Sequence, residues 1–191
     1  GRIEKGGDRL YLGDRCCRLS VIDPVSLEVV DKTGLAATVY TLAEAGNHLL
    51  VAGLSGGLQV LDRSRIGGHV VRTQKTPGGC RDILAVGRWL YIADTHGGIL
   101  LKSLDRWNDA PVRLSGRPGE SFYLDRARNL LFVALGTEGV EVFDVSDPGK
   151  PVSVAVWPHL RARKISGSGT LRFVSKVIHG IDRIATARLD E

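Results

Sequence analysis

Histidines and carboxylates in the loops are the residues of this chain whose chemistry could support metal binding or catalysis. His96, His159 and His179 lie in three different loops, and imidazole is a common ligand of zinc and copper. They do not occupy equivalent positions along the internal repeat of the chain. We therefore interpret them as polar loop residues and predict no metal site.

Asp82, Asp94 and His96 are close enough in sequence to suggest acid–base chemistry. Such catalysis requires hydrogen-bond reach and matched pKa values, which the spacing alone does not establish. The serines near glycine, Ser115 and Ser168, lack the strand–turn–helix setting of a hydrolase nucleophile. The glycine-rich stretch 53–57 precedes a strand and not a helix, so no helix N-terminus awaits a phosphate. We predict no catalytic residue and no cofactor.

The three cysteines, Cys16, Cys17 and Cys80, have no metal-binding spacing and form no even-numbered disulfide framework. We interpret them as small buried or half-buried thiols.

Composition indicates a folded chain with a basic surface. Hydrophobic residues make up 43% of the 191 residues, and the net charge is +5, concentrated in residues 161–191. The basic residues are dispersed and few aromatics accompany them, so nucleic-acid binding is disfavoured. No apolar run reaches the length of a transmembrane helix. The chain begins with glycine and without an apolar leader, so we expect a processed form or a piece of a longer protein.

An internal repeat sets the architecture that must position these residues. Five similar segments end at positions 23, 62, 103, 144 and 185, so the steps are 39, 41, 41 and 41 residues. A fixed period in this range is typical of proteins in which one supersecondary unit is copied. The third repeat shows the pattern most clearly, with short runs at 81–86, 89–93, 99–104 and 111–114 separated by turn residues.

Each unit therefore reads as four short antiparallel strands. The second strands, such as residues 130–134, are apolar throughout and must be covered on both faces. The third strands carry Gln59, Lys102 and Glu141 between apolar neighbours, which we interpret as a more peripheral position. No repeat holds a helical-period stretch of ten residues, which excludes an α-solenoid, and a parallel β-helix has shorter rungs.

We predict an all-β fold, a β-propeller of four-stranded antiparallel blades. The predicted repeats are 1–37, 38–78, 79–119, 120–160 and 161–191. They form either a closed five-bladed ring or an arc of a ring of roughly six to eight blades. An open arc would leave two apolar blade faces exposed.

The fourth repeat contains a specific pattern, Gly-Val-Glu-Val-Phe-Asp-Val-Ser-Asp-Pro-Gly-Lys-Pro, at residues 139–151. This resembles the LVIVD-repeat family, and similar pieces occur at residues 56–62 and 97–99. Asp144 and Asp147 have a structural interpretation, because a carboxylate before proline caps the backbone amides of a turn. The resemblance implies a propeller, often on secreted or surface-attached proteins and usually without assigned chemistry.

In a propeller, the linkers between blades and the loops between second and third strands share one face. We predict a non-enzymatic scaffold that presents this face to a protein or glycan partner, with an extracytoplasmic or cell-surface location implied by the resemblance. The alternative is a hydrolase or lyase with a site in the central channel. The predicted partner-binding residues are Arg81, Asp82, Asp94, His96, Trp157, His159, Arg161, Arg163 and His179.

Overall fold

The computed structural model describes residues 2–6, 8–14, 16–64, 69–168, 171–178 and 181–188, which form five antiparallel sheets. The first contains β1 (Arg2–Gly6), β2 (Arg9–Gly13), β3 (Arg18–Ile22) and β4 (Val29–Gly34). The second contains β5 (Thr41–Ala45), β6 (His48–Gly53), β7 (Gly57–Asp62) and β8 (His69–Gln74). The third contains β9 (Cys80–Val86), β10 (Trp89–Asp94), β11 (Gly98–Ser103) and β12 (Val112–Ser115). The fourth contains β13 (Ser121–Asp125), β14 (Leu130–Ala134), β15 (Val140–Asp144) and β16 (Val152–Trp157). The fifth contains β17 (Lys164–Ser168), β18 (Leu171–Ile178) and β19 (Ile181–Arg188).

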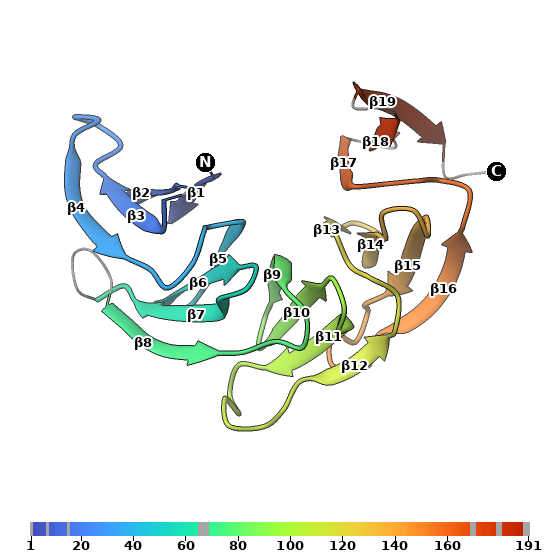
Figure 1. Cartoon of the computed structure of the whole chain (residues 1–191). Coiled ribbons are helices and arrows are strands. Elements are labelled where there is room, and N and C mark those ends of the chain that lie inside the picture. The colour runs from blue at the N-terminus through green and yellow to red at the C-terminus, as the bar shows by residue number, and fades with distance from the viewer. Residues whose placement is uncertain are drawn as a thin grey trace.

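The sheets are arranged as propeller blades. Within each sheet the strands pair in chain order, and consecutive sheets contact each other through their first strands, β1 to β5, β5 to β9, β9 to β13 and β13 to β17. Figure 1 shows these first strands innermost and β4, β8, β12 and β16 along the outer rim. The predicted fold, a propeller of four-stranded antiparallel blades, is confirmed. The described residues include no helix long and apolar enough to span a membrane.

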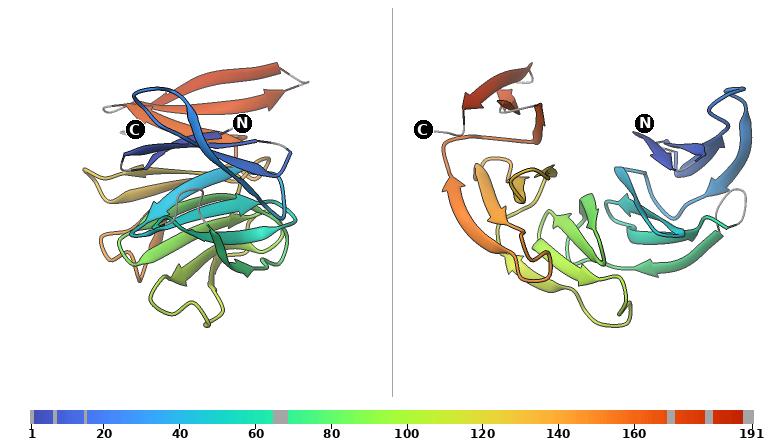
Figure 2. Two further views of the ribbon diagram at one scale, coloured as in Figure 1. Left: turned by 90° about the vertical axis from the view of Figure 1, so that its left-hand side faces the viewer. Right: turned by 180° about the vertical axis from the view of Figure 1, so that it is seen from behind.

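The five sheets form an open arc. The first and fifth sheets stand on either side of the opening, and the view from behind shows the same gap (Figures 1 and 2). The second, third and fourth sheets therefore each lie between two neighbouring sheets, whereas the first and fifth sheets stand at the ends of the arc. Among the described residues, the first sheet packs against the second sheet alone.

Four apolar clusters fill the spaces between neighbouring sheets. Between the second and third sheets, for example, Leu50 and Val60 pack against Leu90 and Ile92, and all four are buried. Residues of the second strands of the second, third and fourth sheets are covered on both faces, as their uninterrupted apolar sequence predicts. The sheets are therefore held together by inter-blade packing, which is the driving force of the fold.

The interpretation of the third strands as peripheral is wrong for their polar residues. Gln59 and Glu141 are buried, at equivalent positions of β7 and β15. The Gln59 Oε1 atom accepts a 3.0 Å bond from the Ala36 amide, in the linker from the first sheet. The Glu141 carboxylate accepts bonds from the hydroxyls of Ser115 and Ser153, at 2.9 and 2.8 Å. Both carboxylate oxygens of Glu141 are thus satisfied, whereas in Gln59 the Oε1 atom is bonded and the buried Nε2 atom has no hydrogen-bond partner among the described residues.

Lys102 is also buried, with 1% of its surface exposed. Its Nζ atom donates to the carbonyl oxygens of Arg106, Trp107 and Asp109, at 3.4, 2.9 and 2.7 Å. Burial lowers the pKa of this ammonium below its usual value. Lys102 therefore holds the loop between β11 and β12 in place.

The cysteines are free thiols. Cys80 is buried and Cys17 half-buried, as predicted, whereas Cys16 is exposed. Burial raises the pKa of the Cys80 thiol, and the negative charges of Asp94 and Asp82 raise it further. This thiol is therefore unreactive.

Candidate functional site

One face of the arc carries both the linkers between sheets and the loops that join second to third strands. We call it the loop face. At each of four joints an amide from the linker, or from the first residue after it, donates to a carbonyl at or just beyond the end of the second strand of the preceding sheet. The bonds are Val39 to Asp14 at 3.3 Å, Cys80 to Leu54 at 3.2 Å, Gly119 to Asp94 at 3.2 Å and Ala162 to Gly136 at 2.8 Å. The repeated contact fixes the loop face against the sheets.

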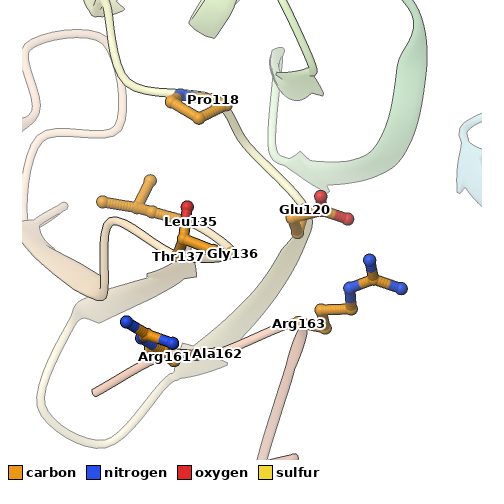
Figure 3. Close-up of a pocket in the computed structure, with 8 residues that line it drawn as sticks. All are labelled: Pro118, Glu120, Leu135, Gly136, Thr137, Arg161, Ala162 and Arg163. Atoms are coloured by element: carbon orange, nitrogen blue, oxygen red, sulfur yellow. The ribbon is translucent and has the colours of Figure 1, made fainter. Parts of the chain in front are cut away.

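A cavity of about 220 Å³ opens on the loop face at the junction of the fourth and fifth sheets. Three segments far apart in sequence meet there: the linker before β13, the loop after β14 and the linker before β17. Figure 3 shows the lining residues, which are Pro118, Glu120, Leu135, Gly136, Thr137, Arg161, Ala162 and Arg163. The Gly136 amide donates a 2.7 Å bond to the Ala162 carbonyl, so the floor of the cavity is rigid.

Charged side chains give this cavity a positive character. The Glu120 carboxylate forms a 2.8 Å ion pair with Arg81 of the preceding sheet. Arg161 and Arg163 are exposed, and no ion pair of either is found within the described part of the chain. One carboxylate is therefore neutralised while two guanidinium groups remain available. Such a site favours a carboxylate or another planar anion, which guanidinium binds through two parallel hydrogen bonds.

The charged residues follow the repeat around the inner ends of the sheets. Tyr40, Glu120 and Arg163 directly precede the first strands of their sheets, and Arg81 lies at the start of β9, between the two residues that pair with the end of β10. The Arg81 guanidinium lies 5.9 Å from the centre of the Tyr40 ring and also pairs with Glu120. Contacts between neighbouring members thus run from the second sheet to the fourth. The loop face carries an ordered row of side chains close to the propeller axis.

Sequence reasoning missed Glu120, Thr137 and Tyr40. Glu120 follows Arg81 by 39 residues and not by 41, so a fixed step along the sequence skips it. The signal that could have identified it is its position immediately before a first strand. That position becomes clear only when the strands are aligned by their pairing.

Five of the predicted site residues lie in loops or linkers of this face or beside them. Arg161 and Arg163 line the cavity, and His159 is exposed in the same linker. Arg81 is half-buried in its ion pair, and His96 is exposed in the loop after β10. His179 lies outside the described residues.

Trp157 is placed differently from these residues. It ends β16, and its ring stacks on Phe132 with the ring centres 6.3 Å apart. It also packs against the apolar cluster between the fourth and fifth sheets. Its ring therefore covers part of the inter-blade core.

Asp94 is fully buried and binds backbone amides. Its Oδ1 atom accepts from His96, at 3.0 Å, and from Gly97, and its Oδ2 atom accepts from Gly78 and Gly79, at 3.2 and 3.0 Å. Burial by itself would raise the pKa of this carboxyl, but its hydrogen bonds outweigh that effect and lower the pKa. Asp94 thus ties its loop to the preceding linker.

Asp82 has a comparable role at the inner strands. Its Oδ2 atom accepts a 2.8 Å bond from the amide of Phe122 in the next sheet, and its Oδ1 atom accepts from Ile83. Because Asp82 is buried as well, we leave both aspartates out of the proposed site. In the described residues, no group of three or more histidine, cysteine, aspartate or glutamate side chains is arranged to hold a metal ion.

The fold and the loop face define a β-propeller protein, and solved structures agree. A chain of a mitotic checkpoint complex matches with a TM-score of 0.75 and 14% identity, over 92% of this chain and 58% of that one. A functionally unknown protein from Desulfotomaculum acetoxidans DSM 771 matches with a TM-score of 0.70 and 12% identity, over 95% of this chain and 61% of that one. The computationally designed Ika8 protein matches with a TM-score of 0.69 and 11% identity, over 90% of this chain and 54% of that one.

The chain thus spans between half and two thirds of the solved chains it matches. At these identities the likeness shows the fold alone. A family model described as the LVIVD repeat matches residues 77–101, from the linker before β9 into β11. The resemblance to this family is confirmed. No curated protein matches the chain.

Proposed function

We propose that this protein is a non-enzymatic repeat scaffold that binds an acidic segment of a partner protein on its loop face. The cavity between the fourth and fifth sheets is the centre of the binding site. A setting outside the cytoplasm, which the family resemblance implies, is part of the same proposal.

The observation that carries the proposal is the charge distribution around the cavity. Arg161 and Arg163 extend from one linker toward different sides of the cavity (Figure 3), while Arg81 already holds Glu120, which lies on the side of Arg163. An acidic segment that crossed the cavity would meet both guanidinium groups without having to displace a native ion pair. Partly exposed charges of this kind guide association and orientation more than they add affinity. A rigid propeller would hold the site at fixed spacing from neighbouring loops.

A protein partner fits better than a glycan. Tyr40 and Trp157 are the aromatic residues beside the linkers before β5 and β17. The Tyr40 ring is covered by Arg81, and the Trp157 ring stacks on Phe132. Each ring thus has one face taken by a neighbouring side chain, which leaves less aromatic surface on which a sugar could stack. Backbone groups and arginines favour an extended acidic peptide instead.

The test is a binding measurement with a fluorescein-labelled octaglutamate peptide, followed by fluorescence anisotropy. We expect the double variant Arg161→Glu/Arg163→Glu to weaken binding by about tenfold or more, since two rim charges are reversed. The matched control is Arg88→Glu/Arg126→Glu, which changes the net charge equally. These two exposed arginines lie in turns between first and second strands, on the opposite face. The control should change the affinity by less than about threefold.

Equal weakening by both double variants would show a general charge effect and contradict a defined site. Absence of octaglutamate binding to the unmodified protein would also reject the proposal. Heparin serves as the glycan probe. Tighter binding of heparin than of octaglutamate, lost in the loop-face variant, would favour the glycan alternative.

The second candidate is a hydrolase or lyase with its site in the channel. The meeting of Arg81 and Glu120 from different sheets is the observation in its favour. Proton transfer would need a second titratable group near Glu120, and the other cavity-lining residues are arginines, a threonine and apolar residues. Glu120→Gln separates the two functions, because it would abolish turnover by an enzyme but strengthen binding of an acidic peptide.

A further inference from the structure

We infer that the first sheet carries a docking face for a further four-stranded blade of the same repeat type. This face, which we call the outward face, points away from the second sheet. It consists of Ile3, Leu10, Leu12 and Ile22, which are cross-strand neighbours on β1, β2 and β3. The inference does not depend on the proposed function.

The internal repeat shows what the outward face lacks. A step of 39 residues leads from these four residues to Leu42, Leu49, Val51 and Leu61, and the strand pairing of the two sets is the same. In the second sheet these residues are covered by the first sheet and are 5%, 1%, 0% and 0% exposed. In the first sheet, Ile3 is 66% exposed and the other three are only half-buried. The same apolar face therefore exists without its cover.

Later sheets repeat the covered arrangement. Leu90 and Ile92 in the third sheet, and Leu131 and Val133 in the fourth, occupy the positions of Leu10 and Leu12. All four are at most 1% exposed, and each pair packs against the sheet before it. Three of the first four sheets thus use this face as an inter-blade contact.

The existing interfaces also define the chemistry of the partner surface. The covering sheet contributes a large apolar residue from its second strand and two apolar residues from its third strand. At the joint between the second and third sheets these are Leu50, Leu58 and Val60. At the next joint they are Tyr91, Ile99 and Leu101. A sheet that presents this pattern would continue the established interface across the outward face.

A blade completing the ring fits better than a second copy of this chain. Two five-sheet arcs would make a ring of ten blades, whereas propellers typically have about four to eight. The solved chains that match over most of this chain also extend well past it. The opening between the first and fifth sheets in Figure 1 is the place where such blades would stand.

The test adds one blade and asks whether Leu10 becomes buried. A copy of residues 38–78 is joined ahead of residue 1, so that its Leu50, Leu58 and Val60 can reach the outward face. In the 191-residue chain, Leu10→Gln should shift the Tm by less than about 2 °C, as expected of a partly exposed site. The same change at the equivalent buried position, Leu49→Gln, should lower the Tm by more than about 6 °C. In the extended chain, Leu10→Gln should lower the Tm by as much as Leu49→Gln does.

A matched control carries Leu50→Gln and Val60→Gln in the added copy only, and there Leu10→Gln should again have little effect. If the extended chain does not fold, a copy of residues 79–119 replaces the added unit, because Tyr91, Ile99 and Leu101 present the same pattern. If Leu10→Gln lowered the Tm equally with and without the added blade, the inference would be overturned. A dimer of the 191-residue chain, detected by light scattering, that Leu10→Gln dissociates would also overturn it, because a second copy would then be the occupant.

Discussion

The Tyr91 hydroxyl donates a 2.8 Å hydrogen bond to the carbonyl of Pro148 and so joins the third sheet to a turn of the fourth. Pro148 belongs to the Asp-Pro-Gly-Lys-Pro turn between β15 and β16. The next residue, Gly149, lies so close to Trp89 that an added Cβ would come within 2.7 Å of the indole ring. This turn is therefore an inter-blade contact as well as a chain reversal.

Tyr91→Phe should lower the free energy of unfolding by about 1–2 kcal/mol, because the half-buried Pro148 carbonyl loses its donor. Equilibrium urea unfolding measures the change. Lys150→Ala, an exposed change in the same turn, should stay within about 0.5 kcal/mol. An effect of Tyr91→Phe as small as that of the control would mean that the hydrogen bond contributes nothing to stability.

Tyr91 also predicts a dependence of stability on alkaline pH. Burial, and then the charge of Asp147, raise the pKa of Tyr91 to about 12, above its value near 10 in an unfolded chain. The folded state therefore retains the proton longer, and the resulting stabilisation is present below pH 10 and lost between about pH 10 and 12. Urea unfolding as a function of pH should show a smaller loss in Tyr91→Phe than in the unmodified protein. Identical pH profiles would contradict the raised pKa.

Lys102→Met should release the loop between β11 and β12, because three carbonyl oxygens lose the ammonium that they share. We expect faster trypsin cleavage after Arg106 and a loss of about 1–3 kcal/mol in stability. Lys75→Met, a change of the same type at an exposed position, is the control. Unchanged cleavage at Arg106 would show that the loop is held by other contacts.

Val133→Asp should unfold the protein, since this fully buried side chain lies between the third and fourth sheets. An unpaired carboxylate there would cost at least about 4 kcal/mol. Val154→Asp is the matched control in the same sheet, on the outer strand β16, where Val154 is 54% exposed. Circular dichroism and gel filtration distinguish the two, and a folded Val133→Asp protein would show that the blades do not pack as described.

His96→Ala should leave the fold intact, because the residue is exposed and the hydrogen bond of its ring within the described residues is to the neighbouring Thr95 hydroxyl. Asp94→Ala, two residues earlier, should cost about 2–4 kcal/mol, since four backbone amides lose their acceptor. A large drop in Tm for His96→Ala would instead show that His96 is structural.

Asp94 should also contribute to acid sensitivity. Its pKa is lowered in the folded state, so its stabilisation is present above the ordinary pKa near 3.8 and lost as the pH falls through the folded value. Thermal melts from pH 7 to pH 2 should therefore fall less steeply below pH 4 for Asp94→Ala than for the unmodified protein. Parallel curves would contradict this role.

Much of the fold follows from local patterns along the chain. The period of about 41 residues, the apolar second strands and the turn residues predict four short strands per unit, because strand pairing between sequence neighbours is a local event. The structural interpretation of Asp144 and Asp147 is confirmed for the same reason. Each carboxylate accepts a backbone amide two residues ahead, from Ser146 at 2.8 Å and Gly149 at 2.9 Å.

The candidate site depends on contacts between sheets, and local sequence patterns do not predict these contacts. Asp94 and His96 are both polar residues of one loop, yet one is fully buried under four amides and the other is exposed. Gln59, Lys102 and Glu141 read as peripheral but lie inside. Their hydrogen-bond partners come from a linker, from the loop between β11 and β12 or from an outer strand, and these segments are brought to the side chains by the folded structure.

The sequence by itself therefore determined the repeating unit, its antiparallel strands and the apolar faces that must be covered. Only the tertiary structure decided that the linker before β13, the loop after β14 and the linker before β17 meet around one cavity. It alone paired Arg81 with Glu120 and left Arg161 and Arg163 exposed beside them. The physical reason is that strand formation depends on neighbours in the chain. Charge pairing and burial depend instead on how one sheet packs against the next.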